Sequence, residues 1–284
     1  MTDALKKAGK DALGGGIPGA AAMAVQVSTL MWMRTLVNYQ YRYGTPLTLA
    51  FQTLYKDGGI RRFYRGYVAA MIQGPLSRFG DTAANSGVLS LLNEFPQTRS
   101  LPVAVQTAAS SSVSAALRIL WMPIDTIKTT LQVEGTGARA LLRDKIRLQG
   151  IRALFHGALA SSAATFVGHY PWFATYNYLQ ARVPIPSASE SKKRLFRNAW
   201  IGFVAAATSD ICSNALRVIK TTRQTTTVGS GYMDVVRTIV EKDGLVGLFG
   251  RGLKTKLLTN GVQGMLFSVY WKIGQEYLEK TAKK

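Results

Sequence analysis

The chain is poor in cysteine and histidine, and this excludes several kinds of site. Among its 284 residues there are one cysteine, Cys212, and two histidines, so neither an intrachain disulfide nor a cysteine-rich metal site can form. His169 has no second histidine or carboxylate near it in the sequence, which argues against a metal site there. We therefore expect no oxidative folding and no bound metal.

Acidic residues are also scarce, with 15 Asp and Glu against 35 Lys and Arg, which gives a net charge of +20. Because 47% of the residues are hydrophobic, this charge fits either a nucleic-acid-binding protein or a membrane protein whose loops face anionic lipid. The N-terminal segment carries Asp3 and Asp11 and lacks an apolar run before a cleavage site. We therefore expect no secretory signal.

Catalytic patterns are missing as well. The sequence contains no phosphate-binding loop, no nucleophile paired with a base and no closely spaced pair of carboxylates. We expect a protein that is not an enzyme.

What the sequence does contain is an internal repeat. The segment DGGIRRFYRG at 57–66 recurs as QGIRALFHG at 149–157 and as DGLVGLFGRG at 243–252. The closing glycines lie 91 and 95 residues apart, and they are Gly66, Gly157 and Gly252. This spacing predicts a single domain of three units, which we place at residues 15–94, 99–183 and 195–280.

Each unit has two long apolar stretches with a short amphipathic helix between them. The long helices are expected at 17–41, 67–92, 101–133, 158–182, 195–226 and 253–278, and the short ones near 45–56, 139–148 and 232–242. Most long stretches approach or exceed the roughly 20 residues that span a bilayer, but several contain Arg, Lys or Asp. We predict an all-α membrane protein with six transmembrane helices around a polar centre.

Basic residues crowd the end of each unit where its two long helices meet. By the positive-inside rule, all three such ends lie on one side of the membrane. A nucleic-acid-binding function would explain the charge but neither the repeat nor the apolar lengths, so we expect no nucleic-acid partner.

The segment PIDTIK, which begins at Pro123, and the glycine segment that follows it resemble the signature of the mitochondrial carrier family. That signature is Pro, any residue, an acid, two residues and a base near the end of each odd-numbered helix, followed by the glycine motif. The resemblance covers essentially the whole chain. It implies six tilted helices with pseudo-threefold symmetry, short helices on the matrix side, multi-pass insertion in the mitochondrial inner membrane, and a central substrate path.

The resemblance also implies a gate on the matrix side. In such carriers the proline kinks each odd helix, and a ring of ion pairs closes the cavity, so Pro123 is the expected kink. Thr29 and Ala215 replace the proline in units one and three, and Met31 and Arg217 replace the acid. The expected ring has one acid, four bases and two bracing glutamines: Arg34, Asp125, Lys128, Arg217, Lys220, Gln132 and Gln224. We expect this ring to be repulsive.

On the opposite side, the family has a second gate made of an aromatic residue, an acid and a base on each even-numbered helix. Here its remnants are uncharged: Tyr176, Asn177, Gln180 and Tyr270. Amides joining helices in a membrane typically contribute about 1 kcal/mol or less, so we expect a weak cytoplasmic gate.

Substrate contacts in the family lie on the even-numbered helices, about two turns beyond the glycine motif. The corresponding residues are Gln73, Ala164, Thr165, Gly168 and Thr259. Since none is charged, we expect a small neutral or zwitterionic solute rather than a nucleotide or a carboxylate-rich acid. Two further candidates, Arg78 and Asp81, lie three residues apart and form either a substrate site or a structural ion pair. His169 either contacts substrate or bonds to a neighbouring helix.

The glycine motifs precede helix starts, whose free N–H groups attract anions. In the resembling carriers these starts hold cardiolipin phosphates, which implies a lipid site at each motif. The candidate residues are Arg65, Gly66, His156, Gly157, Arg251 and Gly252. Cardiolipin is thus the expected structural lipid, and no other cofactor is expected.

Two functions remain open. The first is a solute transporter that works by alternating access. The second is a carrier-fold protein without transport activity, serving as a structural subunit of a respiratory or ATP synthase complex in the inner membrane.

Overall fold

The computed structural model describes residues 2–187, 190–226 and 231–264, and within these ranges it contains helices and loops but no strand. The elements are α1 (Thr2–Tyr43), α2 (Leu47–Phe63), α3 (Tyr67–Glu94), α4 (Pro96–Arg99), α5 (Val103–Leu120), α6 (Met122–Glu134), η1 (Gly135–Gly137), α7 (Ala138–Gln149), η2 (Gly150–Phe155), α8 (Ala158–Arg182), α9 (Ser191–Thr225) and α10 (Tyr232–Gly250). Residues 253–264 are also helical. The all-α class predicted from the sequence is confirmed.

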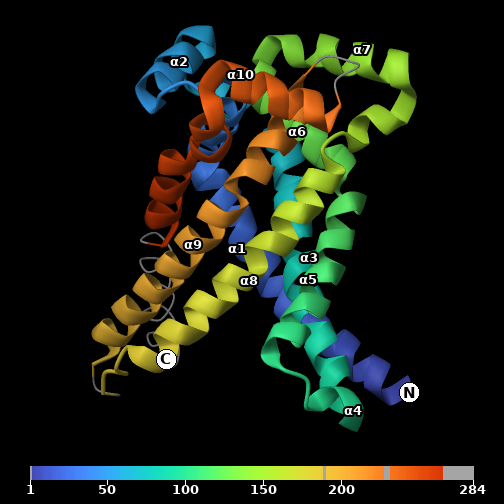
Figure 1. Ribbon diagram of the computed structural model, residues 1–284, viewed down its shortest axis with the longest axis vertical. Helices are drawn as coiled ribbons and strands as arrows, with labels where there is room; N and C mark the ends of the chain where they lie inside the picture. The colour runs from blue at the N-terminus through green and yellow to red at the C-terminus, as the bar shows by residue number, and fades with distance from the viewer. Residues whose placement is uncertain (1, 188–189, 227–230, 265–284) are drawn as a thin grey trace, which may run out of the picture.

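The long helices form a bundle, and α2, α7 and α10 lie across one of its ends, which we call the short-helix end (Figure 1). Successive helices pack side by side: α1 against α3, α3 against α5, α5 against α8, and α8 against α9. In addition, α1, α6 and α9 contact one another in all three pairings. These three helices therefore converge beneath the short helices.

A break at Trp121 divides the helix that the sequence predicts over 101–133. The helix α5 ends at Leu120, α6 begins at Met122, and Pro123 lies in the first turn of α6. Proline is tolerated there because the first N–H groups of a helix have no intrahelical acceptor. The equivalent helices α1 and α9 have no proline at this level and run without a break.

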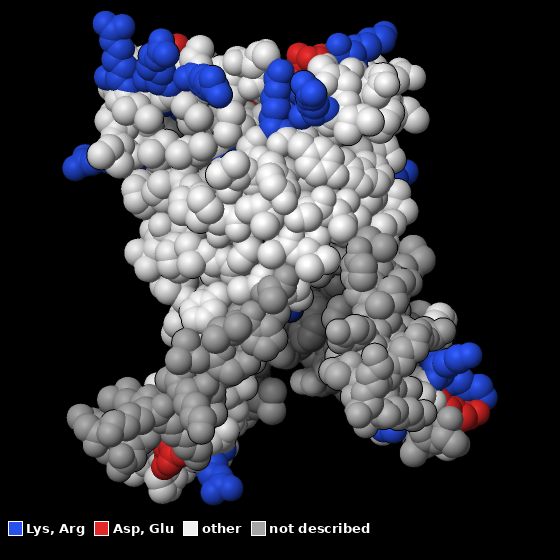
Figure 2. Space-filling view, turned by 180° about the vertical axis from the view of Figure 1, so that it is seen from behind, with Lys and Arg blue, Asp and Glu red and all other residues white. Residues whose placement is uncertain are grey.

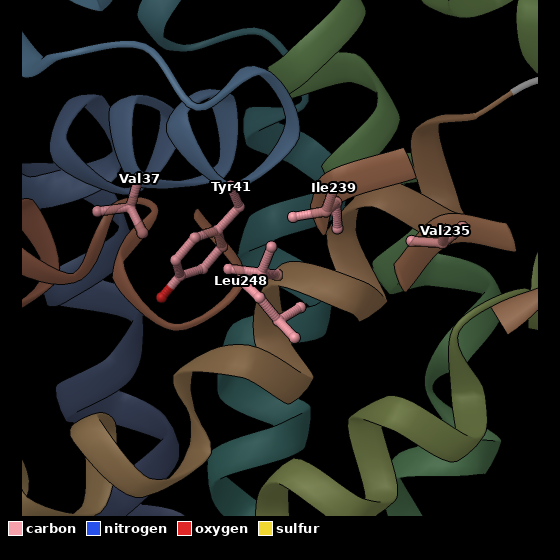
Figure 3. Packing of buried hydrophobic residues seen from close by; sticks show 6 residues of the cluster. Val37, Tyr41, Val235, Ile239 and Leu248 are labelled. Carbon is pink, nitrogen blue, oxygen red and sulfur yellow. The ribbon is translucent and has the colours of Figure 1, made fainter. Parts of the chain in front are cut away.

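An apolar cluster attaches α10 to the seam between α1 and α9 (Figure 3). Its buried members are Val37, Tyr41, Val218, Val235, Ile239 and Leu248. A second cluster, of Leu36, Ala50, Leu54 and Phe63, attaches α2 to α1 in the same way. Burial of these side chains fixes the short helices over the converging ends of the bundle.

The bundle buries many polar side chains and exposes many apolar ones. Buried residues include Thr126, Thr129, Ser213 and Asn214, whereas large apolar side chains such as Val68, Leu159, Phe166 and Ile211 are exposed. Figure 2 shows Lys and Arg gathered along the short-helix end, above a middle belt where they are almost absent. Within the described residues, no single helix has the length and sustained apolar character that crossing a membrane requires.

Candidate functional site

Three glycines allow neighbouring units to pack closely at the short-helix end. Gly66, Gly157 and Gly252 have φ of +82°, +88° and +65°, a conformation that favours glycine. A Cβ on each would lie 3.0–3.2 Å from a backbone carbonyl oxygen of the next unit, namely that of Lys128, Lys220 and Val37. The motif glycines are therefore needed for packing between helices, a role that the sequence pattern alone did not reveal.

Basic side chains near the short helices also join the units. Each donates to a carbonyl near the end of the first long helix of the next unit. These bonds are Arg62 to the Gln132 oxygen at 2.8 Å, Lys145 to the Gln224 oxygen at 2.7 Å, and Arg251 to the Arg42 oxygen at 3.3 Å. A cation is favourable at a helix C-terminus, where carbonyl groups lack partners. Part of the positive charge at this end thus stabilises the protein's own fold.

Two of the basic groups at this end have a pKa well below their usual value. Burial, reinforced by the nearby charge of Arg223, lowers the pKa of Lys145 to about 8. The same two causes lower the pKa of His156 to about 4. With this lowered pKa His156 is neutral at pH 7, and its place in a lipid site stays a prediction.

The centre of the expected matrix gate is Asp125, whose side chain is buried between α6 and α9. One oxygen lies 2.6 Å from the Lys128 Nζ and the other lies 2.6 Å from the Lys220 Nζ. Gln224 Nε2 donates to Asp125 at 3.0 Å and to Thr126 at 3.1 Å. One acid thus pairs with two of the four predicted bases, leaves the group with a net positive charge, and joins two units.

Arg217 has an acidic partner that the sequence analysis missed. Its guanidinium lies 3.3 Å from Asp210 and donates to Ser213 at 3.1 Å, while Asn260 donates to the other Asp210 oxygen at 2.5 Å. The expectation of a repulsive ring did not include this ion pair, which offsets the charge of Arg217. The signal was present, because seven residues span about two helical turns and place Asp210 and Arg217 on one face of α9.

The contact between α1 and α6 is made without ions. Asn38 Nδ2 donates to Gln132 Oε1 at 2.7 Å. Arg34, the base expected to pair in the ring, instead donates to Gln26 Oε1 and the Met23 sulfur, both at 3.4 Å. The gate is thus asymmetric, with ion pairs on one side and amide hydrogen bonds on another.

A cavity of about 330 Å³ lies between the helices and has the gate residues in its wall. Of the predicted substrate contacts, Gln73 and Thr259 line it. Ala164, Thr165 and Gly168 are not among its lining residues, and Gly168 instead accepts a hydrogen bond from Ser209 of α9 at 2.7 Å. The helix α8, which is the second long helix of unit two, therefore contributes less to the cavity than the resemblance implied.

Charged side chains in the cavity wall pair differently from the prediction. Arg78 and Asp81 both line the cavity, but Asp81 pairs with Arg118 of α5 at 2.5 Å rather than with Arg78. Sequence spacing could not identify Arg118, because this pair joins two helices. His169 shares a hydrogen bond of 2.9 Å with Ser111, so its role in the structure is to link α8 to α5.

The predicted remnants of the cytoplasmic gate bond among themselves and to the start of α9. Gln180 Nε2 donates to the Tyr176 hydroxyl at 3.0 Å, and Arg197 donates to Gln180 Oε1 at 2.6 Å and to the Val183 oxygen at 2.7 Å. No hydrogen bond or ion pair of the Asn177 side chain is found among the described residues, and Tyr270 lies outside them. Arg197 thus caps α8, a contact that no motif predicted.

The sequence model of the mitochondrial carrier protein family matches residues 99–185 and 191–281. The chain is 27% identical to mitochondrial substrate carrier family protein C of Dictyostelium discoideum, over 81% of this chain and 51% of that protein. It is 27% identical to the mitochondrial glycine transporter of Aspergillus niger, over 68% of this chain and 62% of that protein. With the mitochondrial arginine transporter BAC2 of Arabidopsis thaliana it shares 27% identity, over 56% of this chain and 55% of that protein. The chain therefore spans about half to three fifths of the length of these relatives.

Proposed function

We propose that this chain, which belongs to the mitochondrial carrier protein family, moves a small solute across the mitochondrial inner membrane by alternating access. The observation that carries this proposal is a charged cavity inside a bundle that exposes many large apolar side chains. A soluble protein would have the opposite arrangement, because burying charged groups is costly unless they are paired or wet. Transport rather than catalysis also fits relatives that are named as transporters.

Placement in a membrane is supported by the distribution of charge on the surface. The middle belt in Figure 2 has almost no Lys, Arg, Asp or Glu, while basic residues gather at the short-helix end. By the positive-inside rule these basic ends share one side of the membrane, and we propose the matrix side, as the resemblance to the family implies. In this arrangement the six predicted long helices each cross the bilayer, and charged residues such as Arg34, Asp125 and Lys220 face the cavity.

The gate geometry suggests how the matrix side opens. Moving α6 away from α9 breaks the contact between Asp125 and Lys220, but Asp125 keeps Lys128 from its own helix. The acid therefore stays neutralised in both states, which lowers the electrostatic cost of opening. A solute that binds the open and closed states differently would shift their populations.

The size of the solute follows from the cavity and the relatives. A volume of about 330 Å³ suits a small metabolite. Glycine and arginine are the solutes named for two relatives, and both are amino acids. We propose a small neutral or zwitterionic metabolite of this kind in preference to a nucleotide.

We also propose that cardiolipin binds at the glycine motifs. Grooves between units are lined by Arg65 and Gly66 in one case and by Arg251 and Gly252 in another. Free N–H groups at the starts of the adjoining helices would receive the phosphates. Cardiolipin should therefore raise the thermal stability of the purified protein more than an uncharged lipid with the same acyl chains. Equal protection by the two lipids would contradict these sites.

The second candidate is a structural subunit of a larger inner-membrane complex. The observation that favours it is the uncharged cytoplasmic gate, whose residues Tyr176 and Gln180 bind each other and Arg197. Such contacts do not need to open and close. Under this alternative the fold would serve only as a scaffold.

Two measurements decide between the candidates. Purified protein in liposomes is assayed for uptake of amino acids, keto acids and nucleotides, with protein-free liposomes as the control. Uptake of any of them above the control would support transport and contradict a purely structural role. Extraction from the native membrane in mild detergent then reports size, and a chain found only inside a much larger complex, with no uptake, would contradict the transporter.

A further inference from the structure

The cavity wall has more positive charge than its acids can neutralise. Its basic side chains are Arg34, Arg78, Arg118, Lys128, Arg217, Lys220 and Lys256. Within the described part of the chain, Asp81 pairs with Arg118, Asp125 with the two gate lysines, and Asp210 with Arg217. These ion pairs leave Arg34, Arg78 and Lys256 without a carboxylate partner among the described residues.

Among the described residues, Arg34 and Lys256 make hydrogen bonds only with neutral groups. Lys256 Nζ lies 3.3 Å from Asn260 Oδ1, and the two bonds of Arg34 are both 3.4 Å long. The two contacts with amide oxygens are longer than the usual 2.7–3.2 Å and therefore weak, and a thioether sulfur is a weak acceptor. Most of the donor capacity of both side chains is therefore free for another acceptor.

Arg34 lies on α1 and Lys256 lies on the helix at residues 253–264. Both side chains line the same cavity. Lys256 is within electrostatic reach of Arg34, Arg217 and Asp210. Two like charges in a partly dehydrated site repel each other, and an anion between them would replace this repulsion by attraction. Neutral polar groups that also line the cavity, such as Gln26, Thr259 and Asn260, could bind the rest of a small solute.

We propose that Arg34 and Lys256 form a binding site for an anionic oxygen group on the transported solute, above all the carboxylate of a zwitterion, and that phosphate binds there by the same chemistry. This proposal rests on the proposed function and gives its solute a chemical class. A guanidinium matches either group with two hydrogen bonds, and Lys256 adds a compact charge. Arg78, which is exposed at the cavity wall, would attract anions toward the site.

Binding is tested first on the purified full chain, without reference to transport. The midpoint of thermal unfolding is measured with succinate, glycine, glycinamide and inorganic phosphate, each against sodium chloride at the same ionic strength. We expect stabilisation by at least one carboxylate or by phosphate, and none by glycinamide, which lacks the carboxylate. Comparison of succinate with phosphate tells which oxygen group the site prefers.

Variants locate the effect. Arg34→Gln and Lys256→Gln should each weaken the apparent affinity for the stabilising anion by about tenfold, while the unliganded variant unfolds at the same temperature as the wild type or higher, because repulsion is relieved. Lys256→Arg keeps the charge and should keep most of the effect. Lys242→Gln is the control, since Lys242 is exposed on α10 and lines neither the cavity nor the two grooves proposed for cardiolipin.

The outcomes separate this proposal from the transport function. If no anion stabilises the wild type beyond chloride, or if the two variants respond as the wild type does, the anion site is wrong even if liposomes show uptake of a neutral solute. If anions bind in the expected way but no uptake occurs, the site stands and the transport function fails.

Discussion

Asp125 on α6 holds Lys220 on α9 at 2.6 Å while its other oxygen holds Lys128. Asp125→Asn should leave two lysines facing each other without a counter-charge, and we expect it to reduce the free energy of unfolding by about 3 to 5 kcal/mol. Thermal unfolding in detergent measures the loss. Asp144→Asn is the control, because Asp144 is exposed on α7 and should have almost no effect. Adding Lys220→Met to Asp125→Asn should restore part of the stability, and a further loss would contradict the pairing.

Arg217→Glu tests whether Arg217 is held by its ion pair with Asp210 or only repels Lys220. If Arg217 only repelled Lys220, the change would stabilise the protein. Because Arg217 pairs with Asp210, we expect the new carboxylate to face Asp210 and to reduce stability by about 1 to 3 kcal/mol. The comparison variant is Arg194→Glu at the exposed start of α9, which should be neutral or mildly stabilising through the helix dipole. A more stable Arg217→Glu protein would show that the Asp210 contact is unimportant.

Gly157→Ala tests the packing role of the motif glycines. At φ +88°, with the new Cβ 3.0 Å from the Lys220 carbonyl oxygen, we expect a loss of about 1 to 3 kcal/mol. The matched change is Gly202→Ala within α9, where the new Cβ would have no neighbour within 4 Å. This substitution should stabilise the helix by up to about 1 kcal/mol, because alanine has the higher helix propensity. The ordering of the two unfolding midpoints is the measurement, and a Gly157→Ala protein as stable as the wild type would refute the close approach.

How much the sequence predicts depends on whether a contact is local. The three glycine motifs and the helix break near Pro123 are visible as short patterns, because proline and glycine act through the backbone at their own positions. The bond from Arg197 to Gln180 and the ion pair between Arg118 and Asp81 depend on how tilted helices face each other. Residues 17 and 37 positions apart cannot be paired by spacing alone, so the charge balance of the cavity could not be derived from the gate motif.

Lys145 should make stability depend on pH in the alkaline range. Its pKa is about 8 in the folded protein and about 10.5 when unfolded, so between these values the unfolded state holds a proton that the folded state has lost. Stability contributed by Lys145 therefore rises as the pH increases from 8 to 10.5, by at most about 3 kcal/mol, and is constant below pH 8. The difference in unfolding free energy between wild type and Lys145→Met measures this rise. Lys56→Met, which changes an exposed lysine, is the control.

The central claim is that solute passes through the cavity between the helices, and the single cysteine of the chain makes this testable. In a Cys212→Ser background, Ser77→Cys places a thiol of nearly the same size at a cavity-lining position. A bulky thiol reagent is then applied, and uptake by liposomes is measured together with the fraction of protein labelled. We predict that labelling Ser77→Cys abolishes uptake in proportion to modification, whereas labelling the exposed Cys212 of the wild type leaves uptake intact. Full uptake by completely labelled Ser77→Cys protein would contradict a path through this cavity.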